Sequence, residues 1–186
     1  MKVFVTTDTH FAHTALVEKH KCRPSDFETQ IAMNWIDTVS NDDLVIHLGD
    51  IAVGATNRWY AIIPGLPGRK ILTLGNHDGK SLQWYMEHGF DFACRKFYWK
   101  MYGLKILFSH VPRHDDTFDI NIHGHLHRGT HHLDVVTDDR HQLLSLEETG
   151  YRPVLLKTLV ETWQQKAVKR RQKAAEFFEA NPVPVV

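Results

Sequence analysis

Five short runs of apolar and β-branched residues recur along the chain, and polar residues able to bind a metal ion follow them. The runs cover residues 3–7, 44–48, 70–74, 105–108 and 119–122. Their length and β-branched content are typical of strands, and none approaches the roughly 20 apolar residues that a membrane-spanning helix needs. The pattern therefore predicts a protein without membrane spans, built around β-strands whose ends carry chemically active side chains.

Helical patterns separate the early strands. Apolar residues recur every four positions from Phe27 to Val39, which predicts an amphipathic helix over residues 24–39. Residues 57–63 and 79–88 are expected to form two shorter helices.

The second half of the chain consists mainly of strand patterns. Residues 97–100 and 105–108 flank a turn that contains Gly103, which predicts a hairpin, and residues 133–136 are expected to form a further strand. The order β-α-β-α-β followed mostly by β predicts an α/β sandwich with a mixed central sheet and helices outside. Because one domain usually takes about 100–200 residues, we expect a single domain over residues 1–186.

Residues 157–180 are expected to form a C-terminal helix that carries apolar residues near one face. Within it, residues 166–173 carry five positive charges. This basic run has two interpretations: the solvated face of a packed helix, or a local patch that binds nucleic acid. The whole chain gives no general preference for a polyanion, because its 22 Lys and Arg residues balance 22 Asp and Glu residues.

Histidine is abundant, with 14 residues against only 2 cysteines. Two cysteines cannot build a thiolate zinc cage or a disulfide framework, whereas histidine is a common metal ligand. The N-terminus becomes polar too early for a signal peptide, so a soluble cytoplasmic protein is expected. What the histidines do depends on whether they are scattered or ordered along the chain.

Oxygen and nitrogen donors gather directly after the predicted strands. Because α/β proteins bind ligands at the carboxyl ends of strands, we expect these side chains to meet. Carboxylate, amide and imidazole donors without thiolates suit Mn, Fe, Zn, Ni or Co, and the set is large enough for two ions that share a carboxylate. The donors are Asp8, His10, Asp50, Asn76, His77, Asp78, His110, His125 and His127.

These donors fall into five ordered blocks. The blocks are Asp8-Thr9-His10, Gly49-Asp50, Gly75-Asn76-His77-Asp78, His110 and Gly124-His125-Leu126-His127. In this order they resemble the signature of the calcineurin-like metallophosphoesterases. The stretch from Asp8 to His13, followed by Arg23-Pro24, is similar to the small single-domain members found in bacteria and phages. The resemblance implies a four-layer-type α/β sandwich with mixed central β-sheets flanked by helices.

The resemblance also implies a role for each position. One ion would be bound by Asp8, His10, Asp50 and His127, and the other by Asp50, Asn76, His110 and His125, with Asp50 bridging. His77 would contact the substrate as a catalytic residue, and Asp78 would orient it. Two divalent ions, Mn foremost and Fe, Zn, Ni or Co as alternatives, would hydrolyse a phosphate ester with a bridging hydroxide as the nucleophile.

Other residues are candidates for binding the substrate or supporting the site. Arg23 and Arg113 are candidate phosphate-binding residues, because a guanidinium matches the geometry of phosphate. His13 is a candidate lining residue. His47 and His123 alternate with apolar residues just before the ligand loops, and we interpret them as hydrogen-bonding residues that are buried or support the ligands.

Three functions are open to such a site. A small phosphodiesterase acting on cyclic nucleotides, nucleotide esters or nucleic-acid ends fits best. Protein phosphatases of the superfamily carry an arginine soon after the third block, where this chain has Gly79-Lys80. A nuclease would use the basic run to hold DNA or RNA, and a non-catalytic metal-binding scaffold would lose ligands or the catalytic histidine. Since His77 and every expected ligand are present, we expect an enzyme.

Overall fold

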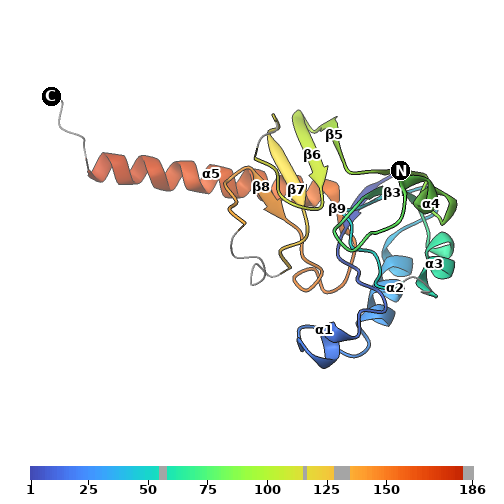
Figure 1. The fold of residues 1–186 in the computed structure, drawn as a ribbon. Helices are drawn as coiled ribbons and strands as arrows, with labels where there is room; N and C mark the ends of the chain where they lie inside the picture. The colour runs from blue at the N-terminus through green and yellow to red at the C-terminus, as the bar shows by residue number, and fades with distance from the viewer. Residues whose placement is uncertain (55–57, 115–116, 128–134, 182–186) are drawn as a thin grey trace.

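Two β-sheets form the centre of the molecule (Figure 1). A computed structural model of the chain describes residues 1–54, 58–114, 117–127 and 135–181. The first sheet has the order β4-β3-β2-β1-β9 and contains β1 (Val3–Thr6), β2 (Leu44–His47), β3 (Arg69–Thr73), β4 (Phe92–Cys94) and β9 (Val154–Leu155). The second has the order β5-β6-β7-β8 and contains β5 (Lys96–Met101), β6 (Leu104–Ser109), β7 (Ile120–His123) and β8 (His141–Leu143). The helices are α1 (Ala15–Glu18), α2 (Phe27–Thr38), α3 (Trp59–Ile62), a 3₁₀ turn at Ile63–Gly65, α4 (Leu82–Glu87) and α5 (Leu156–Ala180).

Alternation along the strands gives the first sheet two apolar faces. Phe4 and Val45 contribute to a buried cluster with residues of α2, α3 and α4, of which Trp35 is among the largest side chains. The neighbouring positions Val5 and Ile46 point the other way, into a second cluster shared with the second sheet and the start of α5. The resulting order is helices, first sheet, second sheet, as period-two side-chain alternation dictates.

The strands that precede the predicted donors run in the same direction within each sheet. In the first sheet β1 pairs in parallel with β2, and β2 with β3, through a register that aligns Val5, Ile46 and Ile71. In the second sheet β6 pairs in parallel with β7, with Phe108 opposite Ile122. Parallel strands place their carboxyl ends at one edge, so the loops that follow them can share a site.

The structure confirms the α/β fold with mixed sheets and flanking helices. The five predicted strands correspond to β1, β2, β3, β6 and β7, and β5 and β6 form the predicted hairpin. The strand expected at residues 133–136 is wrong in its described part: Val135 and Val136 form no strand, and residues 133–134 lie outside the described residues. Val136 is 74% exposed, so its apolar character did not reflect a place in the core. None of the helices in the described ranges is long and apolar enough to cross a membrane.

Candidate metal and substrate site

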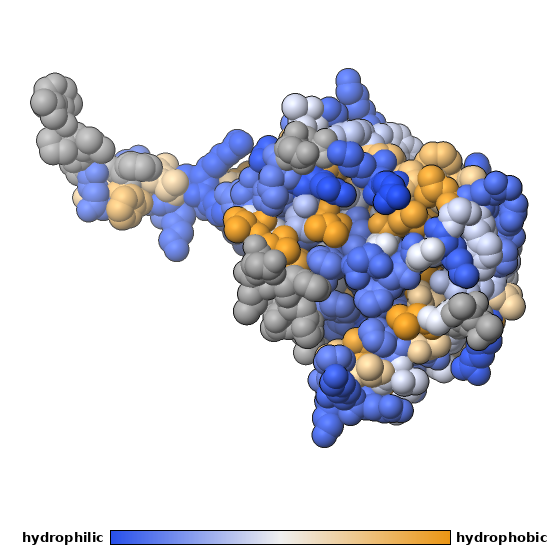
Figure 2. Space-filling model, viewed as in Figure 1, coloured by the Kyte–Doolittle hydropathy of each residue, from blue (hydrophilic) through white to orange (hydrophobic). Residues whose placement is uncertain are grey.

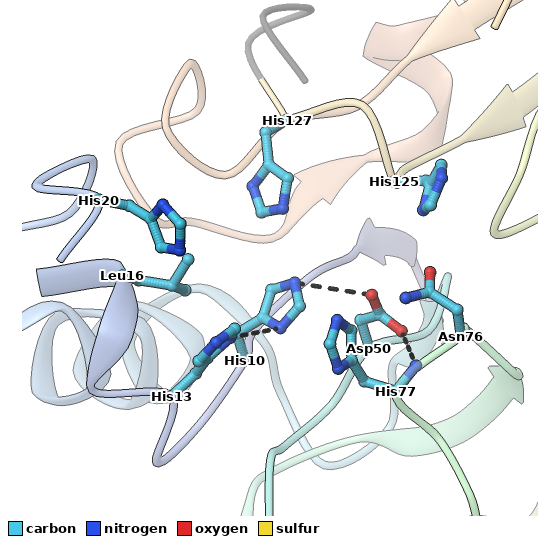
Figure 3. A pocket seen from close by; sticks show the side chains of 9 residues that line it. All are labelled: His10, His13, Leu16, His20, Asp50, Asn76, His77, His125 and His127. Atoms are coloured by element: carbon cyan, nitrogen blue, oxygen red, sulfur yellow. Dashed lines mark hydrogen bonds and ion pairs between the residues drawn. The ribbon is translucent and has the colours of Figure 1, made fainter. Parts of the chain in front are cut away.

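Loops at the ends of five strands bring the predicted metal ligands together. Figure 3 shows five of these ligands: His10, Asp50, Asn76, His125 and His127. β1 leads into Asp8 and His10, and β2 leads into Asp50. Main-chain hydrogen bonds tie these two loops together, since Asp8 N donates to Gly49 O at 2.9 Å and His10 N donates to Asp50 O at 3.0 Å. The side chains of both loops are therefore fixed relative to one another before any ligand binds.

Five of the candidate ligands have a left-handed backbone. Such positive φ values are uncommon for residues other than glycine and concentrate at functional sites, where surrounding structure holds them in place. The residues are Asp8, His10, Asp50, His125 and His127, with φ between 46° and 69°.

One group of ligands consists of Asp8, His10 and His127, whose donor atoms all lie within 4.8 Å of one another. His10 Nε2 is 3.6 Å from Asp8 Oδ1, and the rings of His10 and His127 stack with centroids 5.2 Å apart. Asp8 Oδ1 and His10 Nε2 are buried, and neither has a hydrogen-bond partner among the described residues. A bound cation would satisfy these two buried, unpartnered atoms, which lie side by side. Their chemistry, a carboxylate oxygen and an imidazole nitrogen, therefore fits a divalent metal ion.

A second group consists of Asp50, His110 and His125, again within 4.8 Å of one another. His110 Nε2 lies 3.3 Å from Asp50 Oδ2, 3.0 Å from Asn76 Oδ1 and 3.1 Å from His125 Nδ1. The other ring nitrogen of His110 donates to Leu48 O at 2.8 Å, which leaves Nε2 to face the cluster. A hydrogen bond to a backbone carbonyl fixes the ring of many metal-binding histidines in this way.

The electrostatics of both groups favour positive charge. Burial alone would raise the pKa of Asp8, but the neighbouring His10 and the positive charges of His110 and His127 hold it well below its ordinary value. Burial lowers the pKa of His110, but Asp50 and Asp8 outweigh this and raise it to about 9. Carboxylates that hold a proton on a buried imidazole will also attract a metal ion in its place.

Two glycines allow the loops to approach closely enough to form the site. A Cβ on Gly75 would overlap the carboxylate of Asp50, and a Cβ on Gly124 would overlap Asp8 Oδ2 and Thr7 Oγ1. The backbone at Gly124 thereby lets His125 N donate to Asp8 Oδ2 at 3.0 Å, which links the two sheets at the site.

A family model described as calcineurin-like phosphoesterase matches residues 1–183. The chain belongs to this family. It is therefore a metal-dependent phosphoesterase, and its His and Asp clusters are the groups that could bind the metal.

The chain is also similar to other proteins and to a solved structure. Protein MJ1445 of Methanocaldococcus jannaschii is 27% identical over 184 residues, which cover 91% of this chain and 95% of that one. The gene 66 protein of Mycobacterium phage D29 is 37% identical over 79 residues, 41% of this chain and 40% of that protein. The crystal structure of a protein of unknown function from Aquifex aeolicus, AQ665, matches with a TM-score of 0.68 at 25% identity, covering 87% of this chain and 98% of that one.

Asp78 does not take the position predicted for it in this phosphoesterase. Its carboxylate accepts backbone hydrogen bonds from Asp50 N at 2.7 Å, Gly75 N at 2.8 Å and Ile51 N at 3.1 Å, and neither oxygen bonds to the ring of His77. Its contacts therefore do not support the predicted role of orienting His77. Asp78 instead holds the loop that carries Asp50 against the loop that follows β3.

Arg23 also differs from its predicted role as a phosphate-binding residue. Its side chain is fully buried, and its Nε and Nη2 lie 2.8 Å and 2.7 Å from Glu147 Oε1, while Nη1 donates to Thr9 O at 3.1 Å. The guanidinium is therefore occupied inside the protein and is absent from the lining of the pocket. Sequence reasoning missed Glu147, which lies 124 positions from Arg23 and follows none of the ligand blocks.

Glu147 connects this buried arginine to the metal ligands. Its Oε1 accepts from His127 Nδ1 at 3.2 Å, and its Oε2 accepts from Ser145 Oγ at 2.7 Å. Burial would raise the pKa of Glu147, but His127 and Arg23 hold it well below its ordinary value. The ionised carboxylate thus holds the His127 ring, whose donor atom lies within 4.8 Å of those of Asp8 and His10.

Arg113, the other predicted phosphate-binding residue, is exposed and does not line the pocket. Its backbone N donates to Asn121 Oδ1 at 2.9 Å, which anchors the loop after β6 but directs no charge to the ligands. The structure therefore does not bring either arginine to the candidate site.

His47 and His123 are both buried and hydrogen-bonded, as interpreted from the sequence. His47 Nδ1 accepts from Gly49 N at 3.1 Å, and its Nε2 therefore donates to Thr9 Oγ1 at 3.1 Å. Burial lowers the pKa of His47 to about 3, so it stays neutral and holds the two ligand loops without binding an ion itself.

A pocket of about 210 Å³ opens onto the ligands (Figure 3). His77 is exposed there, with its ring centroid 5.1 Å from that of His10 and 5.6 Å from that of His13. The predicted lining residue His13 is present, together with Leu16 and His20, which the sequence did not single out. Leu16 lies on the short helix α1 and His20 just after it, and four helical residues give too little periodicity to predict which side chains face the pocket.

Proposed function

We propose that this phosphoesterase hydrolyses phosphodiesters with two divalent ions that share Asp50. The observation that carries the proposal is the position of Asp50 Oδ2, which is 3.6 Å from His10 Nε2 and 3.3 Å from His110 Nε2. His10 belongs to one ligand group and His110 to the other. One carboxylate oxygen between two sets of donors is suited to bridging two cations.

The two groups supply the ligand sets that the family resemblance implies. Asp8, His10, Asp50 and His127 would hold one ion, and Asp50, Asn76, His110 and His125 the other. A pair of ions supplies positive charge to the phosphoryl oxygens and an activated water as nucleophile. Because all donors are oxygen or imidazole nitrogen, Mn²⁺ is the ion we propose first, with Fe, Zn, Ni and Co as alternatives.

The charge of the site favours a diester over a monoester. Two divalent cations offset by Asp8 and Asp50 leave two positive charges, which one anionic nucleophile and one singly charged diester neutralise. A phosphate monoester carries close to two negative charges near neutral pH and would need a further cation. No Lys or Arg is found among the described residues that line the pocket, since Arg23 is buried against Glu147.

His77 is the residue that we propose to contact the substrate. Its backbone N donates to Asp50 Oδ1 at 2.8 Å, which fixes it beside the bridging carboxylate. A ring nitrogen of His77 lies within 4.8 Å of donor atoms of His10 and Asp50, so a phosphate bound between the ligand groups is within its reach. In that position His77 can give a proton to the leaving alkoxide.

The test is a metal and substrate screen on the full chain. Metal-free protein is titrated with Mn²⁺ and the alternative ions, and turnover is measured with bis-p-nitrophenyl phosphate and with p-nitrophenyl phosphate. We expect two ions per chain and faster turnover of the diester. Asp50→Asn should lose one ion and nearly all activity, while Asp37→Asn, an exposed aspartate on α2, should lose neither.

Each alternative function has its own result in the same screen. Metal binding without turnover of any ester would indicate a scaffold and refute the proposal. Turnover of oligonucleotides alone would replace the small diester with a nuclease substrate. Full activity in Asp50→Asn would show that the bridge does not exist.

A further inference from the structure

The C-terminal helix α5 extends beyond the body of the molecule (Figure 1). Leu156 and Val160 are buried in the core between the sheets, and Trp163 is half-buried against it. From Lys166 to Ala180 nearly all described side chains are exposed. Helices in proteins owe most of their stability to packing of an apolar face, which the second half of α5 lacks.

The cations of this segment are concentrated on one side of the helix. At about 100° per residue, Lys166, Lys169, Arg170 and Lys173 fall within a stripe about 100° wide, and Arg171 falls outside it. Lys166, Lys169 and Lys173 form no ion pair with any other described residue, whereas Asp139 holds Arg170. The stripe therefore carries positive charge that the protein itself does not neutralise.

A groove of about 580 Å³ lies between this stripe and the edge of the second sheet. Its lining consists of His141, Gln142, Leu143, Trp163, Lys166, Lys169 and Arg170. No carboxylate is among these lining residues, and β8 is the last strand in the described order of its sheet. The groove thus combines three cations, an aromatic ring and a strand edge.

The chemistry of the segment favours a nucleic acid over a membrane. Its exposed large apolar side chains include Val168 and Phe177, at 52% and 61% exposure. They lie about 180° apart around the helix, so they form no continuous apolar face for a bilayer. Most of the projecting surface is hydrophilic (Figure 2).

We propose that this groove and the cationic stripe bind single-stranded nucleic acid, and that the phosphodiester substrate belongs to such a strand. The substrate assignment rests on the proposed diesterase function, whereas binding at the groove does not. Regularly spaced phosphates match a row of cations along a helix, and a flat aromatic side chain at the groove suits an unpaired base.

Binding is tested separately from hydrolysis by keeping the protein free of metal. Anisotropy of a labelled single strand of about 12 nucleotides is measured with the full chain in EDTA, at several salt concentrations. Phosphate contacts from Lys166, Lys169 and Lys173 give a slope of log affinity against log salt of about −2.1, so affinity should fall about 20-fold between about 50 and 200 mM salt. An affinity that does not depend on salt would overturn the proposal.

A triple variant and a matched control locate the site. Lys166→Gln/Lys169→Gln/Lys173→Gln should remove nearly all of this salt-dependent loss, because Asp139 holds Arg170, the one cation of the stripe that remains. Arg171→Gln removes the same type of charge outside the stripe and should bind as the unchanged chain does. Circular dichroism confirms that both variants keep α5. Equal weakening by Arg171→Gln would show a diffuse charge effect and refute the groove.

The two proposals can fail independently. Turnover of bis-p-nitrophenyl phosphate without salt-dependent strand binding would overturn the groove and leave the diesterase. Strand binding without turnover of any diester would overturn the diesterase and leave the groove as a binding site. Preference for vesicles of anionic phospholipid over the oligonucleotide would reassign the stripe to a membrane and refute our choice of partner.

Discussion

Glu147→Ala removes the carboxylate that joins a candidate metal ligand to a buried cation. In the structure Glu147 accepts from His127 at 3.2 Å, from Arg23 at 2.8 Å and from Ser145 at 2.7 Å. The side chains of Glu147 and Arg23 are 2% and 0% exposed, so water cannot replace what the substitution removes. The variant should therefore change both the stability of the fold and the binding of one metal ion.

The two effects have different magnitudes. Removing one partner of a buried ion pair leaves the other charge uncompensated, which typically costs about 3–5 kcal/mol of unfolding free energy. Loss of the carboxylate that orients a metal-binding histidine typically weakens metal affinity by about 10–100-fold. Only the ion at Asp8, His10 and His127 should weaken, because His110 is oriented separately by Leu48 O.

Calorimetric metal titration and chemical denaturation measure the two effects on the same protein. Glu147→Gln keeps an oxygen that can accept from Arg23 and His127, so it should recover the metal affinity more fully than the stability. Glu176→Ala, on the exposed part of α5, is the control for both measurements. If Glu147→Ala lowered stability but left both ions bound as before, Glu147 would be purely structural and the reasoning would be refuted.

Three other outcomes follow from the site geometry. Gly124→Ala should weaken binding of the ion at Asp8, because the new Cβ would overlap Asp8 Oδ2. The same overlap should lower the free energy of unfolding by about 1–3 kcal/mol in chemical denaturation. Gly79→Ala, where the space around the new Cβ is open, should change neither metal affinity nor stability. Metal affinity should rise with pH up to about 9, because an ion must displace the proton that Asp50 and Asp8 favour on His110; a pH-independent affinity in titrations from pH 6.5 to about 9 would contradict this. Arg113→Ala should leave KM for a small diester unchanged in steady-state assays, and a large increase would restore Arg113 as a phosphate-binding residue.

The ligand groups could be predicted from the sequence because each ligand is marked by its immediate neighbours in the chain. Each donor follows a short strand, and parallel pairing of β1 with β2 and of β6 with β7 is enough to bring the strand ends together. The role of each donor within the site, by contrast, stays a prediction that the metal titrations test. The sequence could therefore predict which residues lie close together.

The contacts that support the ligands could not be predicted in the same way. Arg23 and Glu147 are 124 positions apart, and each resembles an ordinary solvated charge in its local sequence. Only the packing of the loop before β9 against the loop after α1 buries them together. The apolar character of residues 133–136 was misleading for a related reason, since Val136 lies at the surface and burial is a property of the whole fold.

Backbone strain explains why supporting residues and ligands have the same chemical character. A left-handed residue other than glycine costs about 1–2 kcal/mol, so the five strained ligands together would use much of a typical net stability of about 5–15 kcal/mol. Hydrogen bonds must hold these strained turns in place. At these buried strand ends the side chains that form such bonds are carboxylates and imidazoles, the same groups that serve as candidate metal ligands. Asp78 holds Asp50 N, His47 holds Gly49 N and Glu147 holds His127. An aspartate or histidine beside a ligand block therefore indicates where along the sequence the site lies. Only the contacts of that side chain show whether it binds the ion or holds the turn that carries the ligand.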